Sequence, residues 1–107
     1  MVRQTVAQFD FDMNRIVSLL RDGDEAGARS IFNSEIFPRY EKILSTDTNN
    51  PLSRVILFFY DLDEFLNNPT AKSYGVSTRE NIIGSYYSDY QKDLEQAFIN
   101  ERKYHPV

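Results

Sequence analysis

The chain has 107 residues, with 16 acidic side chains against 12 basic ones and a formal net charge of −4. It contains no cysteine and one histidine, His105, which excludes a disulfide framework, a thiolate metal site and a cluster of histidine ligands. The acidic balance argues against direct nucleic-acid binding, because such binding neutralises phosphates with basic side chains. We therefore expect one small domain over 1–107 that holds neither a metal nor a cofactor.

No apolar leader or long apolar run is present. The longest apolar run, 55–60, is far too short to span a bilayer. The N-terminal residues are mixed and polar, without the apolar core of a secretory signal. We expect a cytoplasmic protein that does not bind a membrane.

The first segment, about 4–21, is predicted to be an amphipathic helix. Its apolar residues recur at helical spacing and form one stripe: Val6, Phe9, Met13, Ile16, Val17 and Leu20. Gly23 is typical of the left-handed residue that ends a helix, and Asp24 is a suitable cap for the next one.

The second helix is predicted over about 25–45, with a kink at Pro38. Its apolar face comprises Ala28, Phe32, Ile36, Tyr40 and Ile43. A proline inside a helix donates no amide hydrogen bond and crowds the carbonyl four residues earlier, which here belongs to Ser34.

The third helix is predicted over about 51–67, with Asn50 as its N-cap and Pro51 as its first residue. Its apolar residues cover more than half of the circumference, so we expect neighbours on two sides: Leu52, Val55, Ile56, Phe58, Phe59, Leu62, Phe65 and Leu66.

A fourth helix, about 77–103, is predicted to begin at the capping box Ser77-Thr78-Arg79-Glu80. Its core stripe is expected to be Ile83, Tyr87, Tyr90, Leu94, Ala97 and Phe98. No segment alternates with a period of two as a strand does. The chain is therefore predicted to be all-α, an irregular antiparallel four-helix bundle.

Asp63 is the most unusual acidic residue, since it lies within the apolar arc of the third helix. A buried carboxylate needs a partner, and Arg79 begins the helix that should pack nearby, so we expect an Asp63–Arg79 structural pair. A ligand-binding or catalytic carboxylate and a solvated position at the rim are the alternatives.

A second stripe of the fourth helix combines aromatic, aliphatic and acidic residues, which is typical of a recognition surface. It comprises Ile82, Tyr86, Asp89 and Asp93, and Phe11, between Asp10 and Asp12 on the first helix, is the second candidate for partner binding. The alternative is that Ile82 and Tyr86 widen the core and that Phe11 is an isolated exposed side chain.

No motif for catalysis is present. The acidic cluster around Gly23 lacks the ligand spacing of a calcium-binding loop, and a di-iron bundle would need histidines on two helices. The chain also lacks the glycine-rich loops and nucleophile motifs of common enzymes. We expect no enzymatic activity.

Parts of 52–102 resemble a family of uncharacterised small helical domains from bacteria and phages. The resemblance lies in Leu52-Ser53-Arg54-Val55-Ile56-Leu57-Phe58-Phe59-Tyr60-Asp61-Leu62, Gly75, Ile82-Ile83-Gly84-Ser85-Tyr86-Tyr87 and Phe98-Ile99-Asn100-Glu101-Arg102. Members of that family often follow a membrane helix, which this chain lacks, and Tyr60-Asp61 stands here where the family pattern has a glutamate. The resemblance implies a helical fold and transfers no functional residue.

The leading interpretation is a non-enzymatic protein-binding module, of the inhibitor, immunity or adaptor type, whose protein partner has a basic surface. One alternative is an acidic mimic of nucleic acid that blocks a nucleic-acid-binding enzyme. Another is a ligand-sensing bundle with a pocket lined by tyrosines and Asp63. Homodimerisation is left open.

Overall fold

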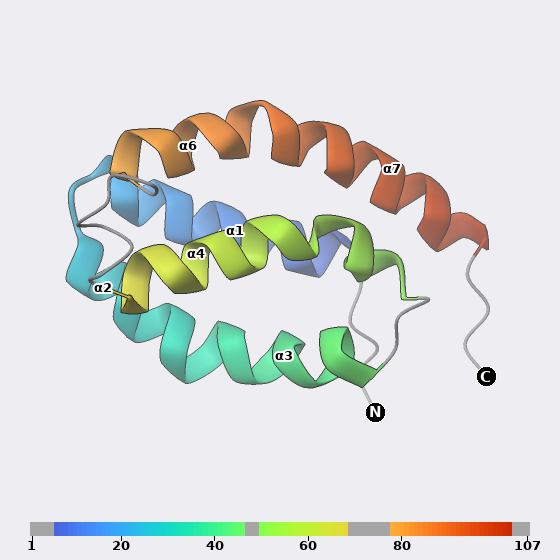
Figure 1. The fold of residues 1–107 in the computed structure, drawn as a ribbon, viewed down its shortest axis with the longest axis horizontal. Helices are drawn as coiled ribbons and strands as arrows, with labels where there is room; N and C mark the ends of the chain where they lie inside the picture. Colours follow the sequence, from blue (N-terminus) through green and yellow to red (C-terminus); the bar gives the residue numbers. More distant parts are fainter. Residues whose placement is uncertain (1–5, 47–49, 69–77, 104–107) are drawn as a thin grey trace.

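The computed structural model describes residues 6–46, 50–68 and 78–103, and these segments are helical almost throughout (Figure 1). The α-helices are α1 (Val6–Arg21), α2 (Glu25–Ile31), α3 (Phe37–Thr46), α4 (Ile56–Asn67), α6 (Arg79–Tyr87) and α7 (Asp89–Lys103). A π-helical turn, η1 (Phe32–Ile36), joins α2 to α3, and a 3-10 turn, η2 (Pro51–Val55), precedes α4. The predicted all-α class is confirmed. None of the described helices combines the length and apolar character needed to cross a membrane.

The helices form an antiparallel four-helix bundle, as predicted (Figure 1). Its four members are α1, the α2–η1–α3 rod, η2–α4 and the α6–α7 rod. Both α1 and α4 pack against α2 on one side and α6 on the other. They therefore occupy opposite corners of the bundle, and α4 lies in front of α1 in Figure 1.

The irregularity expected at Pro38 takes the form of the π-helical turn η1, one turn earlier. The amide of Phe37 donates to the carbonyl of Phe32, five residues back, and the helix continues from there without a restart. Pro38 has no amide hydrogen, and its ring would crowd the Ser34 carbonyl in a regular α-helix. The wider π turn accommodates the proline within a continuous rod.

The predicted helix caps at Gly23, Asp24 and Asn50 are confirmed. Gly23 has a φ of 84°, and the Asp24 carboxylate accepts a hydrogen bond of 2.9 Å from the amide of Gly27. The Asn50 side chain accepts from the amide of Leu52 at 2.9 Å. These bonds satisfy amides that have no partner within the helix.

The fourth predicted helix is divided at Ser88 into α6 and α7. Ser88 has non-helical angles, φ −119° and ψ −88°, and its hydroxyl donates to the carbonyl of Gly84 at 2.8 Å. The side chain of Gln91 donates to the carbonyl of Tyr86 at 3.0 Å, which satisfies a group that the break releases. Thr78 caps α6 by accepting from the amide of Asn81, while Ser77 of the predicted capping box lies outside the described residues.

The break corrects the predicted core stripe of this rod. Ile82 and Tyr86 are 3% and 4% exposed, whereas Tyr87 is 52% exposed and Ile83 is half-buried. Beyond the break Tyr90, Leu94 and Ala97 are buried as predicted, and Phe98 is half-buried against the core. The buried stripe of α6 is therefore shifted by one residue, a rotation of about 100° for an α-helix.

Two glycines give a matched test of this backbone. Gly23→Ala should lower the free energy of unfolding by about 1 kcal/mol, because its φ of 84° is unfavourable for a side chain. Gly84→Ala should raise it by about 0.5–1 kcal/mol, because an added Cβ meets nothing within 4 Å in a helical position. Urea denaturation of both variants measures the two changes, and equal effects would contradict the assigned backbone conformations.

Candidate functional site

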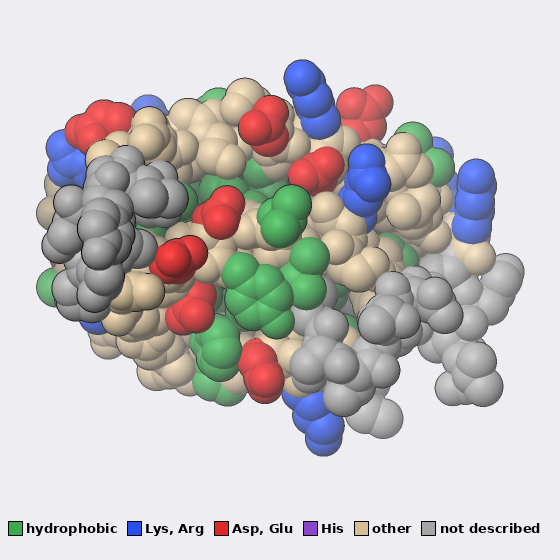
Figure 2. Space-filling model, viewed as in Figure 1, with side chains coloured by type: hydrophobic (Ala, Val, Ile, Leu, Met, Phe, Trp, Pro, Cys, Tyr) green, Lys and Arg blue, Asp and Glu red, His purple; other side chains and the backbone are tan. Residues whose placement is uncertain are grey.

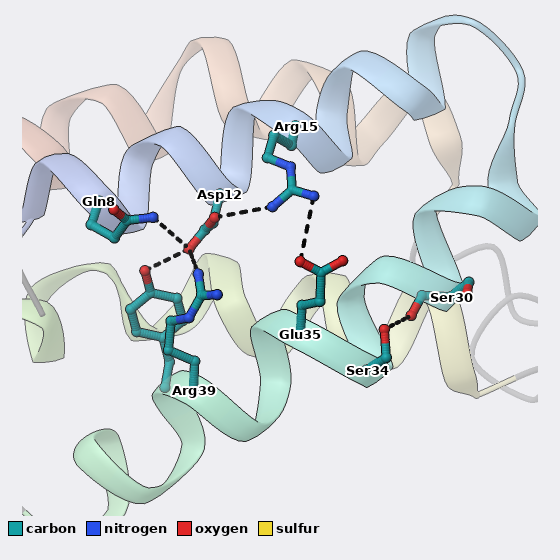
Figure 3. A network of polar contacts seen from close by, with 8 residues as sticks. Gln8, Asp12, Arg15, Ser30, Ser34, Glu35 and Arg39 are labelled. Carbon is teal, nitrogen blue, oxygen red and sulfur yellow. Dashed lines mark hydrogen bonds and ion pairs between the residues drawn. The ribbon is translucent and has the colours of Figure 1, made fainter. Parts of the chain in front are cut away.

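The most unusual side chain in the described structure is Asp12, which is charged and fully buried on the inner side of α1. Its Oδ2 accepts hydrogen bonds of 2.7 Å from the Tyr40 hydroxyl and 2.7 Å from Nη1 of Arg39 (Figure 3). The side-chain Nε2 of Gln8 donates to the same oxygen at 3.4 Å. Three groups from two helices thus converge on one carboxylate oxygen.

The other oxygen of Asp12 is less well satisfied. Oδ1 accepts no hydrogen bond in the described structure and lies 3.5 Å from Nη1 of Arg15. Arg15 also approaches Glu35, with its Nη2 3.7 Å from Oε1 (Figure 3). Because breaking a buried ion pair leaves an uncompensated charge, this network ties α1 to η1 and α3.

Asp12 is a site that the sequence prediction missed. It lies three residues after Phe9 and four before Ile16, so its spacing places it beside the core stripe of α1. In the sequence it stands out only as one of the two acids that flank Phe11. Its role in the structure is to hold two helices together.

The predicted Asp63–Arg79 pair is corrected, because the structure does not bring these residues together. Asp63 is half-buried, and its Oδ1 accepts a hydrogen bond of 2.9 Å from the side-chain Nδ2 of Asn67. Asn67 in turn exchanges two 2.9 Å hydrogen bonds with Asn33. Arg79 lies 3.6 Å from the carboxylate of Glu80, its neighbour in sequence. Asp63 therefore belongs to the contact of α4 with the second rod and not to the junction with α6.

The predicted stripe of Ile82, Tyr86, Asp89 and Asp93 does not form one exposed surface. Ile82 and Tyr86 are core residues, and the Tyr86 hydroxyl accepts from Asn14 at 3.1 Å. Burial raises the pKa of Tyr86. Asp93 lies 3.8 Å from Arg54, and Asp89 is exposed. The two residues that were expected to anchor a partner instead anchor α6 to the core.

Phe11 is 61% exposed on α1, so the sequence placed this side chain on the correct face. Its flanking acids are both engaged within the fold: Asp10 accepts from the Tyr90 hydroxyl at 3.1 Å, and Asp12 is buried. Phe11 is thus an exposed apolar side chain whose acidic neighbours are turned toward the protein.

A different surface combines exposed apolar and acidic side chains. It consists of Leu57, Tyr60, Asp61 and Glu64, which are exposed on one side of α4 at positions i, i+3, i+4 and i+7. We call these four residues the α4 face. Leu57 is 70% and Tyr60 39% exposed. Figure 2 shows apolar side chains gathered at the centre of this side of the molecule, with acidic side chains beside them.

The sequence contains a signal for the α4 face. The apolar residues predicted to be in the core do not occupy one sector of the helix circumference. That sector holds Leu57, Tyr60, Asp61 and Glu64. Asp61 is exposed as a residue, but neighbouring atoms partly desolvate its carboxyl. This desolvation, together with the negative charge of Glu64, raises the pKa of Asp61.

Other features of the described structure offer little chemistry. Among the described residues, no group of three or more histidine, cysteine or acidic side chains is arranged to hold a metal ion. A depression of about 310 Å³ lies at the end of α1, lined by Ser18, Arg21 and Asp22. It does not include Asp63, the carboxylate of the predicted ligand pocket.

Comparison with protein-family models, with curated proteins and with solved structures gives no match for this chain. The resemblance of 52–102 to a family of small helical domains therefore stays a prediction.

The contribution of the Asp12 network to stability can be compared with that of Asp63. Asp12→Ala should destabilise the fold by about 2–3 kcal/mol, because it leaves the buried Tyr40 hydroxyl and the Arg39 guanidinium without their shared acceptor. Asp63→Ala removes one hydrogen bond at a half-buried position and should cost less than about 1 kcal/mol. Thermal and urea unfolding compare the two variants. A larger loss for Asp63→Ala would reverse the assignment.

Two buried tyrosines make stability sensitive to alkaline pH. Burial raises the pKa of Tyr40 and Tyr90 above the ordinary value of 10.0, and the carboxylates of Asp12 and Asp10 raise it further. The folded state therefore keeps protons that the unfolded chain loses near pH 10, so this contribution is complete below that pH and is lost above it.

We expect the free energy of unfolding to fall as the pH rises from about 10 toward 12. Tyr90→Phe should reduce the slope of this decrease, whereas Tyr87→Phe, at a position that is 52% exposed, should leave it unchanged. Urea titrations at several pH values measure the slope. A slope that Tyr90→Phe does not alter would rule out Tyr90 as its source.

Proposed function

We propose that this chain is a non-enzymatic protein-binding module, of the inhibitor or adaptor type, and that it contacts its partner through the α4 face. The observation that carries the proposal is the exposure of Leu57 and Tyr60 beside Asp61 and Glu64 on one helix. Exposed apolar side chains that cluster between polar ones mark interaction surfaces. Tyrosine is also enriched among the residues that dominate binding energy.

The position of Leu57 supports this proposal energetically. Leu57 is 70% exposed, whereas Phe58 and Phe59, which follow it in the chain, are 4% and 0% exposed. Burying a leucine side chain fully contributes about 1.5–3 kcal/mol, and most of that contribution is still available at Leu57. A partner that covers Leu57 and Tyr60 would gain it.

The acidic residues favour a protein partner with a basic surface. Asp61 and Glu64 would steer such a surface toward the α4 face and fix its orientation. An acidic mimic of nucleic acid is the alternative function. On α4 the acids alternate with apolar residues, which fits a mixed protein interface better than a continuous acidic strip.

The function is tested with Leu57→Ser and the matched variant Phe11→Ser, which removes an exposed apolar side chain from the opposite corner of the bundle. Affinity capture from the native host, quantified by mass spectrometry, should recover a stoichiometric partner with the wild type and with Phe11→Ser. Leu57→Ser should lose at least about ten-fold of that recovery, because it removes a central apolar anchor.

Both substitutions lie at exposed positions, so the free energy of unfolding should change by no more than about 0.5 kcal/mol in either variant. Loss of the partner with Phe11→Ser but not with Leu57→Ser would move the interface to α1. Equal recovery with all three proteins, or no specific partner with the wild type, would overturn the proposal.

A further inference from the structure

We propose that the α4 face receives an arginine side chain of the partner protein, whose guanidinium lies between the carboxylates of Asp61 and Glu64. This inference rests on the proposed function, and it specifies the chemistry that the partner brings.

All the charged side chains of α4 are acidic. They are Asp61, Asp63 and Glu64. Asp63 accepts a hydrogen bond from Asn67. Among the described residues, no basic side chain forms an ion pair with Asp61 or Glu64, so their charge is available to a partner.

Asp61 and Glu64 are three residues apart on the same side of the helix, where like charges destabilise each other. Partial desolvation of its carboxyl and the negative charge of Glu64 both raise the pKa of Asp61, in line with this repulsion. A cation placed between the two carboxylates removes the repulsion and compensates the desolvation. The site therefore favours a positively charged group over a neutral one of the same shape.

The spacing of the two acids favours arginine over lysine. Side chains three residues apart have their Cβ atoms about 5–6 Å from each other, which suits a planar group with several donors. A guanidinium carries five N–H donors in a fixed fork, whereas an ammonium is a compact point charge. One guanidinium can thus donate to both carboxylates.

The apolar half of the α4 face suits the rest of an arginine side chain. Leu57 lies one turn before Asp61, and Tyr60 lies one turn before Glu64. The methylene stem of arginine packs on apolar groups, and its guanidinium is attracted to an aromatic ring. A second copy of this chain is a poorer occupant, because two α4 faces in contact would bring like charges together.

The test is an NMR titration of the isotopically labelled full chain with N-acetyl-arginine amide, using N-acetyl-citrulline amide as the neutral analogue. Arginine amide should shift the backbone amides of 57–64 progressively over a titration to about 0.5 M, because an exposed ion pair of about 1 kcal/mol corresponds to a dissociation constant on the order of 0.2 M. Citrulline amide should leave these signals unchanged, and N-acetyl-lysine amide should bind about three-fold more weakly.

The double variant Asp61→Asn/Glu64→Gln keeps the shape of both side chains and removes their charges. It should lose the response to arginine amide at least about five-fold, whereas Phe11→Ser, an exposed position on α1 outside the α4 face, should keep it within about two-fold. The double variant should also capture less of the native partner, and the amount captured should depend less steeply on salt concentration. Signals that shift with protein concentration alone would assign the α4 face to self-association.

The two proposals fail in different ways. If arginine amide shifts no signal in 57–64, or if citrulline or lysine amide acts equally, the arginine site is overturned, while loss of the partner in Leu57→Ser still supports the protein-binding function. If neither Leu57→Ser nor the double variant alters capture of the partner, the protein-binding function of the α4 face is overturned, and the arginine site falls with it.

Discussion

The arrangement of this bundle depends on the buried carboxylate of Asp12. Pro38 interrupts the hydrogen-bond ladder of the second rod, and the π-helical turn that accommodates it alters the direction of the residues that follow. Arg39 and Tyr40 come directly after the proline, and both donate to the same oxygen of Asp12. The register of α3 against α1 is therefore fixed by a polar contact at the point where the backbone ladder is irregular.

This contact also places the aromatic centre of the core. The Tyr40 ring lies 4.9 Å from Phe9 and 6.4 Å from Phe59, measured between centroids. Phe59 further contacts Phe32 and stacks on Phe37. Phe59 is fully buried among rings from α1, η1 and α3. This packing fixes the orientation of α4 about its own axis. That orientation turns Leu57 outward, so the exposed face of α4 is a consequence of core packing.

Much of the fold could be predicted because its signals are local. The stripe of α1 and the caps at Asp24 and Asn50 depend on residues within one or two turns. The buried stripe of α6 could not, because Ile82–Tyr86 and Ile83–Tyr87 each pair an aliphatic residue with a tyrosine at the same spacing. Whether Asp12 or Asp63 is the buried, paired carboxylate depends on partners from another helix, which spacing along the chain does not reveal.

The composition of the α4 face is hard to explain by the needs of the helix alone. Leucine is a good helix former, so Leu57 by itself is unremarkable at an exposed position, but tyrosine is a weaker one and gains little from exposure at Tyr60. Asp61 and Glu64 repel each other on the same side. Natural sequences are locally consistent except where function requires otherwise. The proposed partner, which would cover the apolar pair and neutralise the acids, would account both for Tyr60 and for the repulsion between Asp61 and Glu64.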